Sequence, residues 1–359
     1  RENAAFYTLQ VAIELTNLSD KPQKVEYEMQ GPVGVLLENE EHTSKYRDIH
    51  VEFIDGTKSV TTPAGTVKKY VDTFETETGR PVFQADQFKF MREEKEWTSA
   101  FRYAGVDVQF FAALIAPLDD RPDEVRSNFE TKWIERTFPV LIWTDPVEPR
   151  KSDVSIRMAS NPVELKPKGE GDSVTHKFAF FVGPKRSELL DQAPMSAGQV
   201  LNYGMFGFVA RGMHFMLSMF YSWGMPYFLA IISLTVLVRG CMFPISRKQA
   251  ISAARMKELQ PKLTELKARY ADDKEKMAKA QMELWRKHNI NPIGGCLPLV
   301  IQMPIFIGLY TALNSAVDLR LQKFLWIKNL AAPDALFNMP FTLPYLGSDF
   351  SLLPLCTVG

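Results

Sequence analysis

Up to residue 196, the chain contains several segments in which apolar and polar side chains alternate. In YTLQVAIEL, every second residue from Tyr7 to Leu15 is apolar, with polar residues such as Thr8 and Glu14 between them. Successive side chains of a strand point to opposite faces, so this alternation predicts strands with one buried face. The segments KVEYEM, HVEFI, DVQFFAALIAP and HKFAFFV continue the pattern between turn-rich stretches such as NLSDKP and KGEGDS. The pattern predicts an all-β sandwich over residues 1–196.

Two later stretches, 212–238 and 289–317, contain no Asp, Glu, Lys or Arg. About 20 helical residues, each rising about 1.5 Å, cross a hydrocarbon core of about 30 Å. We therefore expect one transmembrane helix over residues 225–246 and a second over 289–317. The second contains Pro298 and Pro304, which spanning helices tolerate where neighbouring groups satisfy the freed backbone.

Residues 197–224, just before the first predicted span, are rich in aromatic side chains and include Arg211 and His214. Aromatic and basic residues beside a span favour an amphipathic helix that lies in the membrane interface. A helix that packs on the β-domain would have the same composition. The sequence leaves both interpretations open.

The segment between the two spans, residues 247–288, has twelve Lys and Arg against six Asp and Glu, a net charge of +6. Apolar residues recur at spacings of three and four on each side of ADDKEK, where Asp272 and Asp273 are suited to cap a second helix. The segment is therefore a predicted helical hairpin. The positive-inside rule places it in the cytoplasm and the β-domain outside, which is the periplasm of a bacterium. It is either a solvated connector or a docking element for a partner or anionic lipid.

Composition and motifs exclude several other classes of protein. The 42 basic residues balance 42 acidic ones, which argues against direct DNA binding. There is no HExxH, paired CxxC, Walker loop or GxSxG motif, so we expect no enzymatic activity, no metal site and no cofactor. The three cysteines lie in apolar segments, where small packing residues are common. His42, His50 and His176 are scattered in the β-domain and are expected to be surface or satisfied core residues.

Arg239 lies inside the first predicted span, in LTVLVRGCMFPI. A membrane-embedded Arg costs about 2.5 to 3.5 kcal/mol on insertion scales, so it usually faces a bundle interior or water. Alternatively, its side chain snorkels to the headgroups. Thr235 shares its helix face, and Gln302 and Asn314 add amides to the second span. These groups could line a hydrated groove, but Thr235 could instead bond its own backbone and Gln302 could join helices.

Three segments carry a resemblance to a known family: VRGCMFPISRKQA, MKELQPKLTELKARY and NPIGGCLPLVIQMPIFIGLY. Together they resemble the core of the YidC membrane protein insertases. Upstream, WTSAFRYAGVDVQFFAALIAP and FFVGPKRSELL look like parts of that family's large periplasmic domain in Gram-negative bacteria. The resemblance covers most of the chain.

The resemblance implies a multidomain inner-membrane protein with a periplasmic β-supersandwich similar to sugar mutarotases. An α-helical transmembrane core with a cytoplasmic helical hairpin completes the implied fold. In the family, the core encloses a hydrophilic groove, to which Arg239, Thr235 and Gln302 correspond. Phe306 and Leu309 are expected to guide the substrate helix towards lipid, on the basis of their facing alone.

The implied function is insertion of nascent membrane proteins, alone or with the secretion channel. Such a groove lets a polar tail enter the membrane without full desolvation. Implied partners are nascent membrane proteins and membrane lipids. Secretion-channel subunits, the ribosome and targeting factors are further candidates, with the hairpin as their docking element.

Two other functions compete with this one. A membrane-tethered carbohydrate-binding or mutarotase-like protein would need acid and base residues converging in a sugar-sized cleft. A structural subunit of a translocon assembly would use the β-domain to bind partners.

The chain begins with Arg1 instead of Met and stops inside an apolar stretch, SLLPLCTVG. We therefore expect a fragment whose β-domain is incomplete at its N-terminus. Residues 318–349 are expected to form a periplasmic loop, and 350–359 the start of a further transmembrane helix.

Overall fold

The computed structural model describes most of the chain, namely residues 3–38, 43, 45–54, 59–78, 97, 101–118, 133–169, 171–201, 203–270, 274–287, 297–332, 334–343 and 347–351. The chain divides into two compact units. The β-unit comprises residues 1–202, 314–321 and 325–359, and the helical unit comprises 203–313 and 322–324.

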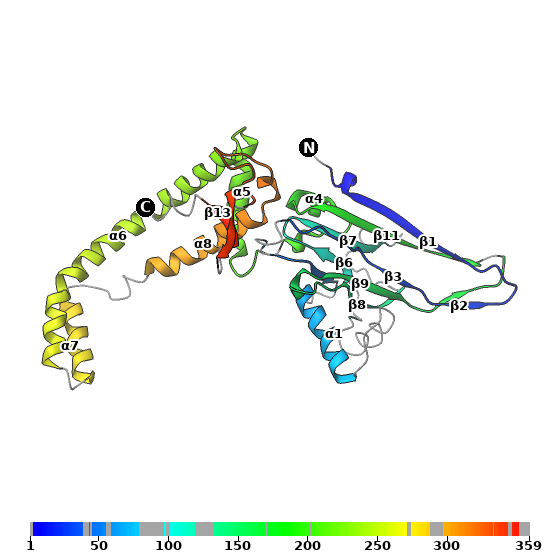
Figure 1. The fold of residues 1–359 in the computed structure, drawn as a ribbon, viewed down its shortest axis with the longest axis horizontal. Helices are drawn as coiled ribbons and strands as arrows, with labels where there is room; N and C mark the ends of the chain where they lie inside the picture. The colour runs from blue at the N-terminus through cyan, green and yellow to red at the C-terminus, as the bar shows by residue number, and fades with distance from the viewer. Residues whose placement is uncertain are drawn as a thin grey trace. The chain divides into compact units, whose positions relative to one another are not determined.

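A six-stranded antiparallel sheet forms the larger layer of the β-unit, with strand order β1-β11-β7-β6-β4-β5. Figure 1 shows β1, β11, β7 and β6 side by side. The strands are β1 (Thr8–Thr16), β4 (Asp48–Phe53), β5 (Val60–Pro63), β6 (Phe101–Asp107), β7 (Phe111–Leu118) and β11 (Ser173–Pro184). The alternation that predicted strands at both ends of the domain is therefore confirmed in β1 and β11.

A second antiparallel sheet has the order β3-β9-β8. Its strands are β3 (Glu28–Gln30), β9 (Asp153–Ser160) and β8 (Ile134–Trp143). Two further antiparallel pairs are formed by β2 (Gln23–Val25) with β10 (Val163–Leu165), and by β12 (Ala335–Leu343) with β13 (Gly347–Ser351).

The core of the β-unit contains apolar side chains from both larger sheets. Ile49 and Val51 of β4, Val106 of β6, and Val154 and Ile156 of β9 are all fully buried in one cluster. Successive side chains of a strand point to opposite faces of the sheet, so the face turned away from this cluster carries other residues. On β4 that other face carries Asp48, His50 and Glu52.

One helix interrupts the region that we predicted to be all β. α1 (Ala64–Thr78) directly follows β5 and contacts β8 and β9. It buries Ala64, Val67 and Val71 in the same core. These residues recur at spacings of three and four, the period of an amphipathic helix. The spacing typical of a helix was therefore present in the sequence. The all-β prediction was wrong for this segment, because α1 packs its apolar face into the core of the β-unit.

Short helical segments complete the β-unit. They are η1 (Ala4–Tyr7), η2 (Pro149–Lys151), α4 (Ser187–Gln192), η3 (Gly198–Val200) and η5 (Val317–Leu319). The stretch from α4 to η3 buries Leu189, Leu190, Met195 and Val200. Residues far apart in the sequence thus join one unit, since η5 lies after the helical unit in the chain.

The helical unit contains α5 (Gly207–Ser222), α6 (Tyr227–Arg269), α7 (Lys274–Lys287) and most of α8 (Leu297–Ser315). α5 packs on α6, and α7 folds back against the end of α6 (Figure 1). Within the described residues, one helical stretch, Tyr227–Arg247 of α6, is long and apolar enough to cross a membrane. Only a small part of it is buried.

α6 continues without a break from the predicted span 225–246 into the predicted hairpin 247–288. Pro244 and Pro261 lie inside this helix of 43 residues. The capping residues expected at 272 and 273 lie outside the described residues, as do 289–296 of the second predicted span. The interval 350–359 begins in β13, and its residues from 352 onward also lie outside the described part.

Candidate functional site

The predicted groove residue Arg239 lies on α6, well inside the apolar stretch Tyr227–Arg247, and its side chain is exposed. It is twelve residues from Tyr227 and eight from Arg247. At about 1.5 Å per residue, these distances are about 18 and 12 Å along the helix. Arg239 is thus a charge placed more than two turns inside the stretch from its basic end.

Thr235 and Gln302, the other predicted groove residues, do not contact Arg239 through any described hydrogen bond. The Thr235 hydroxyl donates to the backbone oxygen of Ile231 at 2.8 Å, one turn earlier. This is the local bond that we considered as the alternative for Thr235. Gln302 is half-buried on α8. The assignment of these residues to a groove therefore stays a prediction.

α8 presents an exposed apolar stripe within the helical unit. Met303, Phe306 and Tyr310 are exposed at spacings of three and four, and Phe306 has 60% of its surface accessible. Leu309, the second residue predicted to guide substrate, is half-buried. Gly308 faces α5, and a Cβ there would lie 2.7 Å from Cγ1 of Val209. The lack of a side chain at Gly308 thus lets α8 and α5 approach closely.

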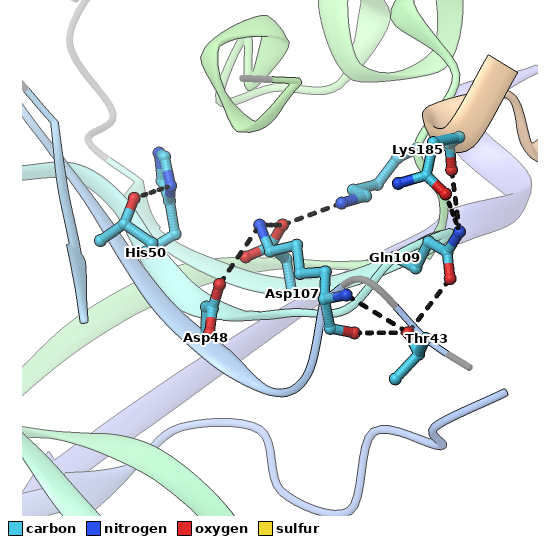
Figure 2. Close-up of polar contacts among 9 residues, drawn as sticks. Thr43, Asp48, His50, Asp107, Gln109 and Lys185 are labelled. Carbon is cyan, nitrogen blue, oxygen red and sulfur yellow. Dashed lines mark hydrogen bonds and ion pairs between the residues drawn. The ribbon is translucent and has the colours of Figure 1, made fainter. Parts of the chain in front are cut away.

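A cluster of charged side chains that the sequence analysis missed lies in the β-unit (Figure 2). Oδ2 of Asp107, at the end of β6, accepts hydrogen bonds from the ammonium groups of Lys45 and Lys185, the latter at 2.9 Å. Lys45 also pairs with Asp48 at 3.8 Å. His50, two residues along the same face of β4, accepts or donates a bond to the Thr61 hydroxyl at 3.3 Å.

Burial and neighbouring charge shift the pKa values of this cluster in opposite directions. Burial raises the pKa of Asp107, but Lys185 and Lys45 outweigh it and hold that pKa below its usual value. Burial raises the pKa of Asp48 to about 6. Burial lowers the pKa of His50 to about 4, which leaves the imidazole neutral at pH 7. Burial likewise lowers the pKa of Lys185.

Acid and base side chains thus converge in the β-unit, as the carbohydrate-binding alternative requires. However, Asp107, His50 and Lys185 expose only 0%, 1% and 5% of their surfaces. Asp107 is also bound by two lysines, so it is held as a structural anion. A sugar has no access to these groups, and their arrangement supports a structural role. Among the described residues, no three His, Cys, Asp or Glu side chains gather as a metal site.

The signal for this cluster in the sequence was weak. Asp48, Asp107 and Lys185 lie on three different strands or their ends, and only the sheet register brings them together, as in the pairing of Asp48 with Asp107. His50 was expected to be a surface or satisfied core residue; it is a core residue whose Nδ1 has a partner, whereas its buried Nε2 has none. His176 shares a hydrogen bond with the Tyr27 hydroxyl. His42 lies outside the described residues.

Comparison with known proteins finds a family match in the later part of the chain. Residues 219–358 match the family model described as 60Kd inner membrane protein. A Vibrio atlanticus protein named membrane protein insertase YidC is 36% identical over 220 residues, which cover 61% of this chain and 40% of that protein. The chain belongs to the YidC family.

Two further relatives named membrane protein insertase YidC support this assignment. One from Aeromonas hydrophila is 42% identical over 176 residues, covering 49% of this chain and 32% of that protein. One from Vibrio cholerae is 34% identical over 254 residues, covering 67% of this chain and 46% of that protein. The chain thus spans less than half the length of these YidC relatives. All five predicted groove and guiding residues fall inside the segment that matches the family model.

Proposed function

We propose that this chain is part of a membrane protein insertase of the inner membrane. The carrying observation is Arg239, an exposed charge more than two turns inside the apolar stretch of α6. A charge at that depth is costly unless it serves a hydrated path or a substrate. Arg239, with Thr235 and Gln302, attracts acidic groups of a nascent protein and lets its polar tail enter without full desolvation.

The exposed stripe on α8 supports a role in guiding the substrate helix. Phe306 and its exposed neighbours Met303 and Tyr310 offer an apolar surface to a second helix or to lipid. Leu309 adds apolar area beside this stripe. The substrate helix moves along it into the bilayer because both surfaces are apolar and its transfer exposes no polar backbone.

The same proposal assigns a location to the hairpin, the β-unit and α5. The net charge of +6 in residues 247–288 favours the cytoplasmic side for α7 and the end of α6, and the β-unit then lies in the periplasm. α5 exposes Phe208 and Phe215 on one face and buries Met213 and Leu217 on the other. An amphipathic helix of this kind lies in the membrane interface.

The hairpin offers a docking surface for the cytoplasmic partners. A groove of about 440 Å³ lies between α6 and α7. Its lining combines the apolar Leu266 and Leu284 with three basic side chains, Lys262, Arg269 and Lys287, and two acidic ones, Glu265 and Glu283. Such a mixed lining fits an amphipathic segment with charges of both signs, from a ribosome-associated or targeting partner or from the secretion channel.

The experiment uses the full-length protein that contains this chain, in cells depleted of their own insertase. Insertion of a single-span protein with an acidic periplasmic tail is measured by the protease accessibility of that tail. Arg239→Ala should lower insertion of this substrate, and a substrate whose tail is neutralised should depend on Arg239 less. Arg247→Ala, at the end of the same apolar stretch, is the matched control and should insert normally.

Two results would argue against the proposal. Equal insertion by wild type, Arg239→Ala and Arg247→Ala would assign Arg239 to snorkelling. Failure of the wild-type protein to support insertion of either substrate would reject the insertase function itself.

A further inference from the structure

Residues 314–320, which we call the strap, belong to the β-unit although they directly continue α8. The strap includes the end of α8 and all of η5. Ala316, Val317 and Leu319 are buried, with 0%, 7% and 3% of their surfaces exposed. A surface loop of this length would leave such apolar residues in water. The strap is therefore packed as part of a folded unit.

The first contact that holds the strap is a pair of hydrogen bonds from Gln109 to Asn314, near the end of α8. The side-chain amide of Gln109 donates to the backbone oxygen of Asn314 at 3.0 Å and to its side-chain oxygen at 2.8 Å. The last carbonyls of a helix lack intrahelical partners. Gln109, more than 200 residues earlier in the chain, thus caps α8. Figure 2 shows its amide oxygen accepting from the Thr43 hydroxyl, at 3.1 Å.

Thr43 links this cap to the buried charge cluster. Its hydroxyl also lies 2.8 Å from the backbone oxygen of Lys45, whose ammonium group binds Asp107. Lys185 binds the same carboxylate from the other side. The cap on Asn314 is therefore connected through Gln109 and Thr43 to the ion pairs of the buried Asp107 (Figure 2).

Two ion pairs form the other fastening points. Arg186, the neighbour of Lys185 in the chain, binds Asp318 at 2.5 Å. Arg320 binds both carboxylate oxygens of Glu38, and its guanidinium lies 4.7 Å from the ring centroid of Phe111. Asp318 exposes only 17% of its side chain, so screening by water is limited there. Bidentate and partly buried pairs of this kind are the strong ones.

We propose that the strap fastens the C-terminal end of α8 to the β-unit, with Gln109, Arg186 and Glu38 as its docking residues. The last residues of α8 are then held by contacts within the β-unit, whereas its earlier residues belong to the helical unit. Because the strap directly continues α8, a loss of order in the strap extends to the last turn of this helix. This proposal does not depend on the insertase function, because it concerns contacts within the chain.

The test measures hydrogen exchange of a peptide that covers the strap, using the full chain in lipid nanodiscs. Arg186→Glu and Asp318→Arg should each raise the exchange rate about tenfold or more, as expected for loss of one charge-assisted hydrogen bond. The double variant Arg186→Glu with Asp318→Arg restores an ion pair in reverse and should return most of the protection. Arg150→Glu changes an exposed pair with Glu148 elsewhere in the β-unit and should leave the strap unchanged.

A second measurement addresses the cap. Gln109→Met removes the amide but keeps the length of the side chain, so exchange in the last turn of α8 should rise while that in β6 stays slow. The proposal is overturned if both single charge variants exchange like wild type, or if the double variant exchanges as fast as they do. Unchanged protection at the end of α8 in Gln109→Met would remove Gln109 from the docking residues.

Discussion

The hydroxyl of Tyr27, between β2 and β3, lies 2.6 Å from Nδ1 of His176 on β11. The imidazole also stacks on Trp133, with ring centroids 5.2 Å apart. Burial lowers the pKa of His176, and burial raises the pKa of Tyr27 to about 12. Both groups are therefore neutral at pH 7 and joined by a neutral hydrogen bond.

Tyr27→Phe should lower the free energy of unfolding of the β-unit by about 1 kcal/mol, the usual value for one neutral hydrogen bond. Urea titration followed by proteolysis of the unfolded fraction would measure it in the full chain. Because the folded pKa of His176 is depressed, wild-type stability should be lost as pH falls below the ordinary His value. A variant as stable as wild type would show that the bond contributes nothing.

Asp48→Asn should change how stability depends on pH. The folded pKa of Asp48 is about 6 against an ordinary 3.8, so the folded state binds its proton more tightly and wild-type stability falls as pH rises from about 4 to 6. Asn removes this loss, and the gain at pH 7 should be up to about 3 kcal/mol. Near pH 3.5 the gain should vanish.

In the same cluster, His50 makes stability depend on pH in the opposite direction to Asp48. Its folded pKa of about 4 lies below the ordinary 6.5, so it contributes stability that is lost as pH falls from about 6.5 to 4. In Asp48→Asn the opposing slope of Asp48 is absent, so the loss of stability on acidification should become steeper than in wild type. Unfolding titrations at half-unit pH steps measure both slopes, and a flat profile in the variant would contradict the assignment.

Lys185→Met should destabilise the β-unit by about 3 kcal/mol, because it leaves the buried Asp107 with one of its two cations. Lys185→Met combined with Asp107→Leu removes the buried charge as well. The double variant should lose clearly less than the sum of the two single variants. Chemical denaturation of the four proteins forms the cycle, and additive losses would show that the two side chains do not act as a pair.

Gly105→Ala should be poorly tolerated. A Cβ at this position would lie 2.2 Å from the backbone oxygen of Ala113 on the neighbouring strand β7, and backbone atoms cannot move aside as a flexible side chain can. The expected loss is about 1 to 3 kcal/mol. Gly34→Ala is a useful comparison, because no atom lies within 4 Å of a Cβ there, although its φ of 70° adds strain. Thermal unfolding of both variants should rank Gly105→Ala as the less stable.

Much of the architecture could be predicted from local patterns. The alternation in β1 and β11 and the spacing of apolar residues in the hairpin are local signals, and the structure has strands and helices there. α1 was missed although Ala64, Val67 and Val71 have helical spacing, because only these three residues mark its buried face in a region dominated by strand patterns. The sequence predicted a separate span and hairpin helix, and α6 instead runs through both.

Some polar sites could likewise be predicted from local sequence, and others could not. Arg239 was visible because a charge inside an apolar run contrasts with its neighbours. Asp107 and Lys185 carry no such contrast, since each is one charge among many in a polar domain. They meet only through the pairing of β4, β6, β7 and β11. The bond from Gln109 to Asn314 spans 205 residues, and nothing in either local sequence indicates it.

The pairing of β1 with β11 has a consequence for synthesis of the protein. Thr8 pairs with Phe181, so among the described strands β1 lacks its neighbour in the sheet until β11 has been made. At about 5 to 20 residues per second, that delay is on the order of 10 to 35 seconds. During this time a strand with unpaired backbone groups is open to the wrong partners. The order of strands therefore requires that β1 be protected from wrong pairing during this delay. This requirement does not depend on the stability of the finished domain.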